Sequence, residues 1–306
     1  GGAIDLAKAT AVAVSGTEGG ADLVLAPATL GAAMAAASPA ALVLSTEEEA
    51  LLPPGIAAPG GGWAFHPPAS VTVVLDADAI VVPSRRPDRG GGSNRGASVP
   101  TIADAAMASL AIAVDAADAM VRDGDEVTNT LVQNTVSNAL EALRYLDGTV
   151  EDDDGKKHAK SHAVSAVVHA GQLLRSGIGT GGGRRSVPLG LASALLPRHF
   201  PHGHALNFFA SLLPGMCVAL SGRAANARAV EGVASTITGG GSISNLVEWA
   251  ERASCGAGIP TLASLAEGTP DVPSMMGNFD ANAALLNCED ADYEFVEEVL
   301  HRSLSR

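Results

Sequence analysis

Aromatic side chains are scarce in this sequence of 306 residues: they make up 3% of it, although 47% of the chain is hydrophobic. Alanine therefore supplies much of the apolar content, and small side chains suit closely packed helices. This composition favours a helix-rich protein and argues against a β-sandwich. The length allows two ordinary domains, each with a core of its own.

Positive charge is scarce as well. The 19 Lys and Arg residues are outnumbered by 33 Asp and Glu residues, and the formal net charge is −14. Direct nucleic-acid binding depends on clustered Lys and Arg residues that displace counterions from the phosphates. We therefore expect no direct contact between this chain and nucleic acid.

Cysteines and long apolar runs are also few. Cys217, Cys255 and Cys288 are odd in number and far apart, which argues against a disulfide framework and indicates a reducing compartment. Residues 205–220 come closest to a membrane span but are too short and contain Asn207. The chain opens without a methionine or a signal peptide, so we expect a processed or truncated N-terminus.

Hydrophobic patterns divide the chain into two parts. Residues 1–97 have α/β character and residues 98–306 are almost entirely helical, so the predicted fold class is α/β plus all-α. In the first part we predict a helix at 3–15, strands at 23–25, 42–44 and 70–75, a loop at 53–68 and a linker at 83–96. In the second part we predict helices at 100–121, 126–145, 160–176, 187–196, 205–220, 242–253 and 292–303, with turns at 151–155 and 239–241.

Seven segments of the chain resemble one known family. They are GGAIDLAK (1–8), APATLGAAM (26–34), VTVVLDADAIVVP (71–83), AVVHAGQLLRSGIG (166–179), FPHGHALNFFASLLP (200–214), GIPTLASL (258–265) and the closing EFVEEVLHRSL (294–304). In this order they resemble the iron-dependent, group III alcohol dehydrogenases, which have the dehydroquinate-synthase-like fold. The resemblance implies a partial Rossmann-like nucleotide-binding domain over 1–97 and a helical, formerly metal-binding domain over 98–306. What precedes the glycine motif in the family, roughly the first half of its nucleotide-binding domain, has no counterpart in this sequence.

The resemblance implies a divalent iron or zinc ion held by an Asp, by a His four residues later and by two further His. An i, i+4 pair lies on one side of a helix, and the metal polarises the alcohol oxygen so that hydride can leave. At the corresponding positions of the first two ligands this sequence has Ala108 and Ile112. The third ligand falls on Pro188 when counted back from His202 and on Gly190 when counted from His204, and a further active-site histidine falls on Ala192 or Ala194. His202 alone has a counterpart among the family's metal ligands, with His204 as its rival.

The distribution of histidine supports the same conclusion whatever the alignment. No histidine lies between His66 and His158, and none lies within residues 170–198. A single imidazole does not hold a catalytic metal. We therefore predict that the metal site is lost and that His202 is a vestige of it.

The nucleotide contacts that the resemblance implies fall on Gly1, Gly2, Asp5 and Lys8. A glycine-rich turn before a helix binds a pyrophosphate through backbone N–H groups and the helix dipole. The next family segment, TGSE, reads AAMA here at residues 32–35, which weakens the nicotinamide site. We treat the four residues as vestigial and predict no cofactor, with NAD(P) and iron or zinc as the alternative.

Other histidines are open to two interpretations each. His199, His202 and His204 are close in sequence and form either a turn with solvated or capping imidazoles, which we favour, or a new metal site. His158 and His162, spaced i, i+4, form either a surface pair, which we favour, or a weak zinc site.

Two more features have a structural and a functional interpretation. The glycine run at 179–183 suggests a phosphate-binding loop but has no following Lys-Ser or Lys-Thr, so a flexible loop is preferred. His169 lies on an apolar helix face and is predicted to be a core histidine with its hydrogen bonds satisfied.

These observations predict a catalytically inactive relative of the iron-dependent alcohol dehydrogenases that serves as a structural subunit of a larger assembly. Other protein subunits would cover the truncated N-terminal domain, because exposed sheet edges and apolar surface need a partner. We expect a mitochondrial location, where some eukaryotic members of the family work, or otherwise a cytoplasmic one. The alternatives are a divergent NAD(P)- and metal-dependent oxidoreductase and a module that binds a small molecule in the interdomain cleft.

Overall fold

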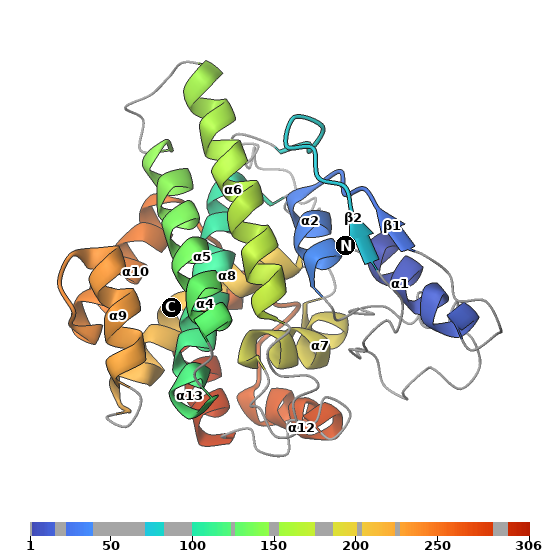
Figure 1. The fold of residues 1–306 in the computed structure, drawn as a ribbon. Coiled ribbons are helices and arrows are strands. Elements are labelled where there is room, and N and C mark those ends of the chain that lie inside the picture. Colours follow the sequence, from blue (N-terminus) through green and yellow to red (C-terminus); the bar gives the residue numbers. More distant parts are fainter. Residues whose placement is uncertain are drawn as a thin grey trace, which may run out of the picture.

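A computed structural model describes most of the chain. The described residues are 2–15, 23–38, 71–82, 100–123, 126–146, 153–174, 186–200, 204–223, 227–283 and 293–306. They form a small α/β unit beside a larger helical part, and the α/β unit lies at the right of the view in Figure 1. The predicted strand at 42–44, the loop, the linker and the glycine run lie outside the described residues, as do Gly1, His202 and Cys288.

The α/β unit consists of α1 (Gly2–Ser15), β1 (Leu23–Leu25), α2 (Leu30–Ala37) and β2 (Val71–Val73). The two strands are parallel, with Val24 opposite Thr72, and among the described residues the sheet has these two strands. An isolated bridge between Thr29 and Val81 continues the pairing. Thr29 also caps α2, because its Oγ1 accepts the N–H of Ala32 at 3.2 Å.

The helical part contains ten described helices. They are α4 (Ile102–Asp123), α5 (Glu126–Arg144), α6 (Asp153–Leu173), α7 (Val187–His199), α8 (Ala205–Ser221), α9 (Ala227–Thr238), α10 (Ile243–Gly256), α11 (Leu262–Leu265), α12 (Val272–Ala283) and α13 (Tyr293–Leu304). Helix α4 forms the centre, because residues 101–118 are all buried and α5, α6, α8 and α9 all contact it. A helix that is buried on every side belongs to the middle of a large core.

A capping box fixes the start of α4. The Asp104 carboxylate accepts the backbone N–H and the hydroxyl of Thr101, each at 2.8 Å, while Thr101 Oγ1 accepts the Asp104 N–H at 3.2 Å. This reciprocal pair satisfies N–H groups that have no partner inside the helix. Asp104 lies in the first turn of α4, where a negative charge is also favourable to the helix dipole.

Two glycines allow helices to approach closely. A Cβ added at Gly171 of α6 would lie 2.6 Å from the carbonyl oxygen of Met34, so α6 and α2 are nearly in backbone contact. A Cβ at Gly215 of α8 would lie 3.0 Å from the Val299 carbonyl oxygen and would overlap the Ser303 hydroxyl on α13. The first contact joins the α/β unit to the helical part, and the second joins two helices within that part.

Most predicted helices are confirmed. The predicted turn at 151–155 is wrong at its second half: α6 begins at Asp153, and Asp153 and Asp154 occupy its first turn, where negative charge is favourable. Helices α2, α9, α11 and α12 have no counterpart in the prediction; α2 consists mostly of Ala, and α11 has four residues. Among the described helices, none combines the length and apolar character that crossing a membrane requires.

Candidate functional site

The positions implied for the metal lie in the apolar core. Ala108 and Ile112 are on α4 and are 0% and 1% exposed. Ala192 on α7, where a further active-site histidine would fall, is fully buried, as is Pro188, and α7 contacts α4. None of these four side chains carries an atom that can bind a metal ion, so the residues present do not fit one.

The described residues around these positions were also compared with the needs of a metal site. Among the described residues, no three His, Cys, Asp or Glu side chains come together in a way that could hold a metal ion. Cys217 is fully buried, and burial raises the pKa of its thiol to about 12. Such a thiol stays protonated at neutral pH and is neither a ligand nor a nucleophile.

Lys8, implied as a nucleotide contact, has a structural partner instead. Its side chain is completely buried, and its ammonium donates to the backbone carbonyl oxygens of Ala35 and Ser38 at the C-terminus of α2. Burial lowers the pKa of Lys8 to about 8, and the nearby carboxylate of Asp5 partly opposes that shift. Lys8 thus holds α1 to the C-terminal end of α2.

Asp115 was not identified from the sequence, yet it links two helices of the implied site. It is 4% exposed on α4, and its Oδ2 accepts the backbone N–H of Val187 at 3.2 Å. Val187 begins α7, whose own N-cap residue, Ser186, forms no side-chain cap. A carboxylate from another helix therefore caps α7, where the helix dipole favours negative charge.

The two described histidines near the implied site, His199 and His204, have different surroundings. Asn278 Nδ2 donates to His199 Nε2 at 2.7 Å, which requires that ring nitrogen to be unprotonated. Burial lowers the pKa of His199, helped by Arg198. His204 occupies the N-cap position of α8 without a side-chain cap, and desolvation lowers its pKa although part of its surface is exposed.

His158 and His162 on α6 each form a hydrogen bond and a ring contact with neighbouring residues. His158 Nδ1 donates to the Asp154 carbonyl oxygen at 2.7 Å, and His162 Nδ1 donates to Asn138 Oδ1 at 3.0 Å. Both rings stack on Tyr145, with centroids 5.7 and 6.2 Å away. His158 is exposed and His162 half-buried, which agrees with the preferred interpretation as a surface pair.

His169 differs from its prediction. Its Nδ1 is buried and has no hydrogen-bond partner among the described residues, so the expectation of a fully satisfied core histidine is wrong for this atom. Burial accordingly lowers the pKa of the ring, because the neutral form costs less to desolvate.

No protein-family model matches the sequence, and no curated protein matches it. Several solved structures do resemble it. An archaeal halo-thermophilic alcohol dehydrogenase from a Red Sea brine pool gives a TM-score of 0.64 at 16% identity, over 94% of this chain and 66% of that one. A maleylacetate reductase from Agrobacterium tumefaciens gives 0.59 at 17%, over 93% and 68%. An iron-containing alcohol dehydrogenase from Thermotoga maritima gives 0.61 at 13%, over 99% and 73%.

The chain has the iron-containing alcohol dehydrogenase fold. This confirms the predicted fold class, and at these identities the likeness concerns the fold alone. The chain spans about two thirds of the length of the first of these structures. On the iron-containing alcohol dehydrogenase fold, then, α4 carries apolar residues at the two positions that the sequence resemblance assigns to an Asp–His pair.

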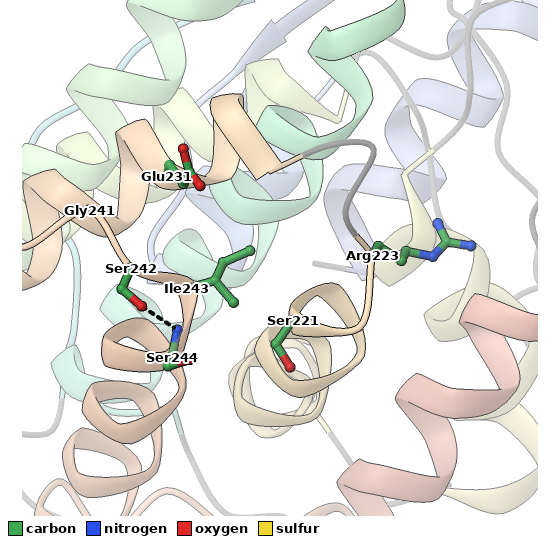
Figure 2. Close-up of a pocket in the computed structure, with 7 residues that line it drawn as sticks. All are labelled: Ser221, Arg223, Glu231, Gly241, Ser242, Ile243 and Ser244. Atoms are coloured by element: carbon green, nitrogen blue, oxygen red, sulfur yellow. Dashed lines mark hydrogen bonds between the residues drawn. The ribbon is translucent and has the colours of Figure 1, made fainter.

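An open pocket lies elsewhere on this fold, between the end of α8, helix α9 and the start of α10. Its lining includes Ser221, Glu231, Ser242 and Ser244, and Ser242 Oγ accepts the Ser244 N–H at 3.2 Å. Figure 2 shows the Arg223 side chain turned away from the two α10 serines. Its guanidinium carbon lies 4.4 Å from the centre of the Phe295 ring, so the charged group does not converge on the pocket.

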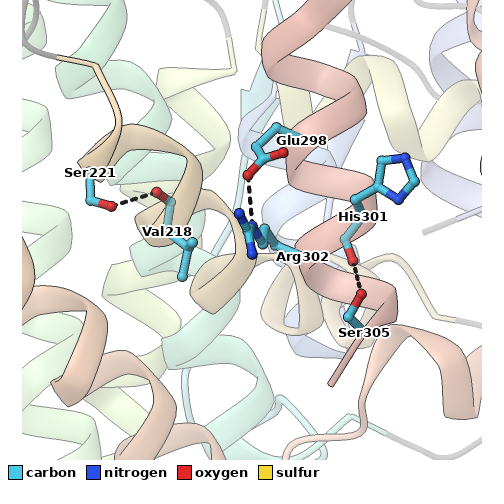
Figure 3. A network of polar contacts seen from close by, with 6 residues as sticks. All are labelled: Val218, Ser221, Glu298, His301, Arg302 and Ser305. Carbon is cyan, nitrogen blue, oxygen red and sulfur yellow. Dashed lines mark hydrogen bonds and ion pairs between the residues drawn. The ribbon is translucent and has the colours of Figure 1, made fainter.

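The nearby ends of α8 and α13 carry several polar contacts (Figure 3). Ser221 Oγ donates to the Val218 carbonyl oxygen at 2.7 Å, and Arg302 Nε donates to Glu298 at 2.7 Å. Each contact joins residues three or four apart on one helix. They stabilise the helix ends and do not assemble a site.

Proposed function

We propose that this chain is a non-catalytic protein on the iron-containing alcohol dehydrogenase fold and that it serves as a structural subunit. The observation that carries the proposal is the complete burial of Ala108 and Ile112 on α4, at the positions assigned to two metal ligands. Alcohol oxidation on this fold needs a Lewis acid to stabilise the alkoxide, and apolar side chains supply no ligand for one.

The surroundings support the same proposal. Replacing ligands by apolar residues frees the fold from a metal, because the helices then hold together by packing. Lys8 and Asp115 form hydrogen bonds with backbone groups at helix ends, which are structural tasks. Other protein subunits are the proposed partners, since a non-catalytic chain of this kind acts through its surface.

Metal content is the first test. The purified protein is exchanged into chelator-free buffer, offered excess Fe²⁺ or Zn²⁺ under reducing conditions, desalted and analysed by plasma mass spectrometry. We expect less than about 0.1 equivalent per chain, because no preformed ligand set is present. The iron-containing enzyme from Thermotoga maritima, treated in parallel, is the control that shows the loading procedure works.

A result near one equivalent would overturn the proposal. The same sample also tests nucleotide binding through its melting temperature with NADH or NADPH at about 1 mM, since a ligand of the native state stabilises it by mass action. We expect no shift. A reproducible rise together with turnover of a small alcohol or aldehyde would support an oxidoreductase instead.

A further inference from the structure

Three polar side chains tie the C-terminal end of α7 to α12. Asn278 on α12 donates from Nδ2 to His199 Nε2 at 2.7 Å, and its Oδ1 accepts a hydrogen bond from the Arg198 guanidinium. The two helices contact each other (Figure 1), and the backbone carbonyl oxygen of His199 also accepts the N–H of Glu267 at 3.0 Å. We call Arg198, His199 and Asn278 the α7–α12 junction.

The orientation of the Asn278 amide follows from the chemistry of its two partners. A guanidinium group has donors and no acceptor, so the oxygen of the amide faces Arg198. The amide nitrogen then faces His199, whose Nε2 must carry a lone pair. Both hydrogen bonds therefore form together while the imidazole is neutral and has its proton on Nδ1.

Protonation of His199 is incompatible with this arrangement. The charged ring has an N–H at both nitrogens, so the N–H at Nε2 would meet the N–H of Asn278 Nδ2. Turning the amide by half a turn presents its oxygen to the ring but sets Nδ2 against the Arg198 guanidinium, which accepts no hydrogen bond. One of the two hydrogen bonds is lost in either orientation, and the charged ring then lies beside a second cation.

The surroundings of the ring favour its neutral form. Burial lowers the pKa of His199 from the ordinary value of 6.5, the charge of Arg198 lowers it further, and Asp271, which precedes α12, opposes both. The Asp271 carboxylate also caps α12, because its Oδ2 accepts the Ser274 N–H at 3.2 Å, and the Glu267 side chain is exposed. Stability contributed by the neutral ring is therefore present above pH 6.5 and is lost as the pH falls through the lower pKa of the folded protein.

Helices α4 and α8 also contact α7, and their acidic and imidazole groups are engaged elsewhere. Asp115 binds the first residue of α7, at the end opposite His199, and Asp118 lies one turn further along α4. Asp104, in the capping box of α4, acts on His204 at the start of α8. The charged groups that act on the ring of His199 thus belong to α7 itself and to the start of α12.

We propose that the α7–α12 junction is a proton-sensitive latch, which holds the polar edge of α12 to α7 while His199 is neutral and releases that edge when His199 takes up a proton. The apolar side of α12 stays packed, since Val272, Met275 and Phe279 are buried. Release is therefore a local loosening of α12 and leaves the rest of the helical part folded.

The test is amide hydrogen exchange of the full chain, followed by mass spectrometry at about pH 5 and about pH 7.5 and corrected for the intrinsic exchange rate at each pH. We expect the protection of α12 to fall by about tenfold at the lower pH, because a hydrogen bond is lost and a donor is left without an acceptor. The protection of α4 should stay unchanged. A titration of the His199 ring carbons by NMR follows the proton itself.

Two variants of the junction should remove or reverse this response. His199→Gln keeps an acceptor oxygen and does not titrate, so α12 should be protected equally at both pH values. Asn278→Asp offers a carboxylate that accepts from Arg198 and from the protonated ring, so the protection of α12 should rise as the pH falls. His158→Gln is the control and should behave as the wild type, because it removes an exposed histidine on α6.

Equal protection of α12 at both pH values in the wild type would overturn the proposal. An unchanged pH response in His199→Gln, or a fall in protection with pH in Asn278→Asp, would do the same. Loss of protection in α4 together with α12 would also overturn it, by showing acid unfolding of the whole protein. The latch goes beyond the proposed structural role and does not depend on metal content, so either proposal can fail while the other stands.

Discussion

The helical part of the molecule is more deeply buried than the α/β unit. Residues 101–118 of the central helix and its cap are all buried, and α5, α6, α8 and α9 contact that helix. The sheet, in contrast, has described strands of three residues, and Val24 is 63% exposed on one of them. Packing alone explains how the first region holds together, whereas the second depends on particular polar ties.

This difference in burial shows which part of the fold holds together by apolar packing alone. Ala108 and Ile112 are buried in the apolar packing around α4, so the helical part holds together without a polar ligand at these two positions. The described residues of the α/β unit do not have apolar packing of this extent. This unit is tied by Lys8 to the end of α2 and by the close approach of Gly171 to Met34.

Placing a carboxylate in the core of the helical part should have the largest effect. Ala108→Asp puts a carboxylate at a position with 0% exposure and no metal to neutralise it. We expect a loss of about 3 kcal/mol or more in the free energy of unfolding, measured by urea denaturation. Ala119→Asp, on the same helix but partly exposed, is the control and should cost far less. Equal costs would mean that the core around Ala108 is hydrated.

Overpacking the helical part comes next. Gly215→Ala places a methyl group 2.9 Å from the Ser303 backbone nitrogen and in overlap with its hydroxyl, so α8 and α13 must separate. We expect a loss of roughly 1–3 kcal/mol in the free energy of unfolding. Gly232→Ala on α9 is the matched control: nothing lies within 4 Å of its added Cβ, and replacing a helical glycine should stabilise by about 0.5–1 kcal/mol. A stable Gly215→Ala would contradict the tight packing described here.

The contact between the two regions should respond differently. Gly171→Ala brings a methyl group within 2.6 Å of the Met34 carbonyl oxygen, which pushes α2 away from α6. We expect faster amide hydrogen exchange in α2 with a smaller change in the main unfolding transition, because a local region can open without the whole protein. Gly277→Ala on α12, where the added Cβ meets nothing within 4 Å, is the control. An equal loss of protection in α4 would make the two regions one cooperative unit.

The sequence predicts the helical part well because its signals are local and long. Helices over ten residues with caps or apolar periodicity, such as α4, α5 and α8, lie close to their predicted bounds. Helix α2 had one recognisable cue, Thr29 before the run of small residues, since its side chain caps the helix. The acidic start of α6 was taken for a turn because Asp153 and Asp154 favour both a solvated loop and a helix N-terminus.

The predicted loss of the metal site rests on the sequence, because histidine is absent from two long stretches of it. The tasks of Lys8 and Asp115 depend on contacts across 27 and 72 residues, and no pattern along the chain encodes them. The exposure of Val24 and the burial of Leu25 also needed the register of β1 and β2, because burial of a strand depends on what packs against it.

The last prediction concerns the tie inside the α/β unit, and its effect is a dependence of stability on pH. The pKa of Lys8 is lowered from 10.5 to about 8 by burial, so between those values the unfolded chain binds a proton that the folded protein does not. Stability contributed by this group is therefore present above pH 10.5 and is lost as the pH falls through about 8.

The measurement compares the wild type with Lys8→Met, which keeps a similar length and has no titrating group. From pH 8 to pH 10 the melting temperature of the wild type should rise relative to that of the variant, and below pH 8 the difference should be constant. Because both proteins share every other titrating group, common effects of pH cancel in the difference. A difference that stays flat across the whole range would mean that Lys8 keeps an ordinary pKa and that the ammonium is hydrated. In that case α2 would be held by packing at Gly171, and the two regions would differ less than their burial indicates.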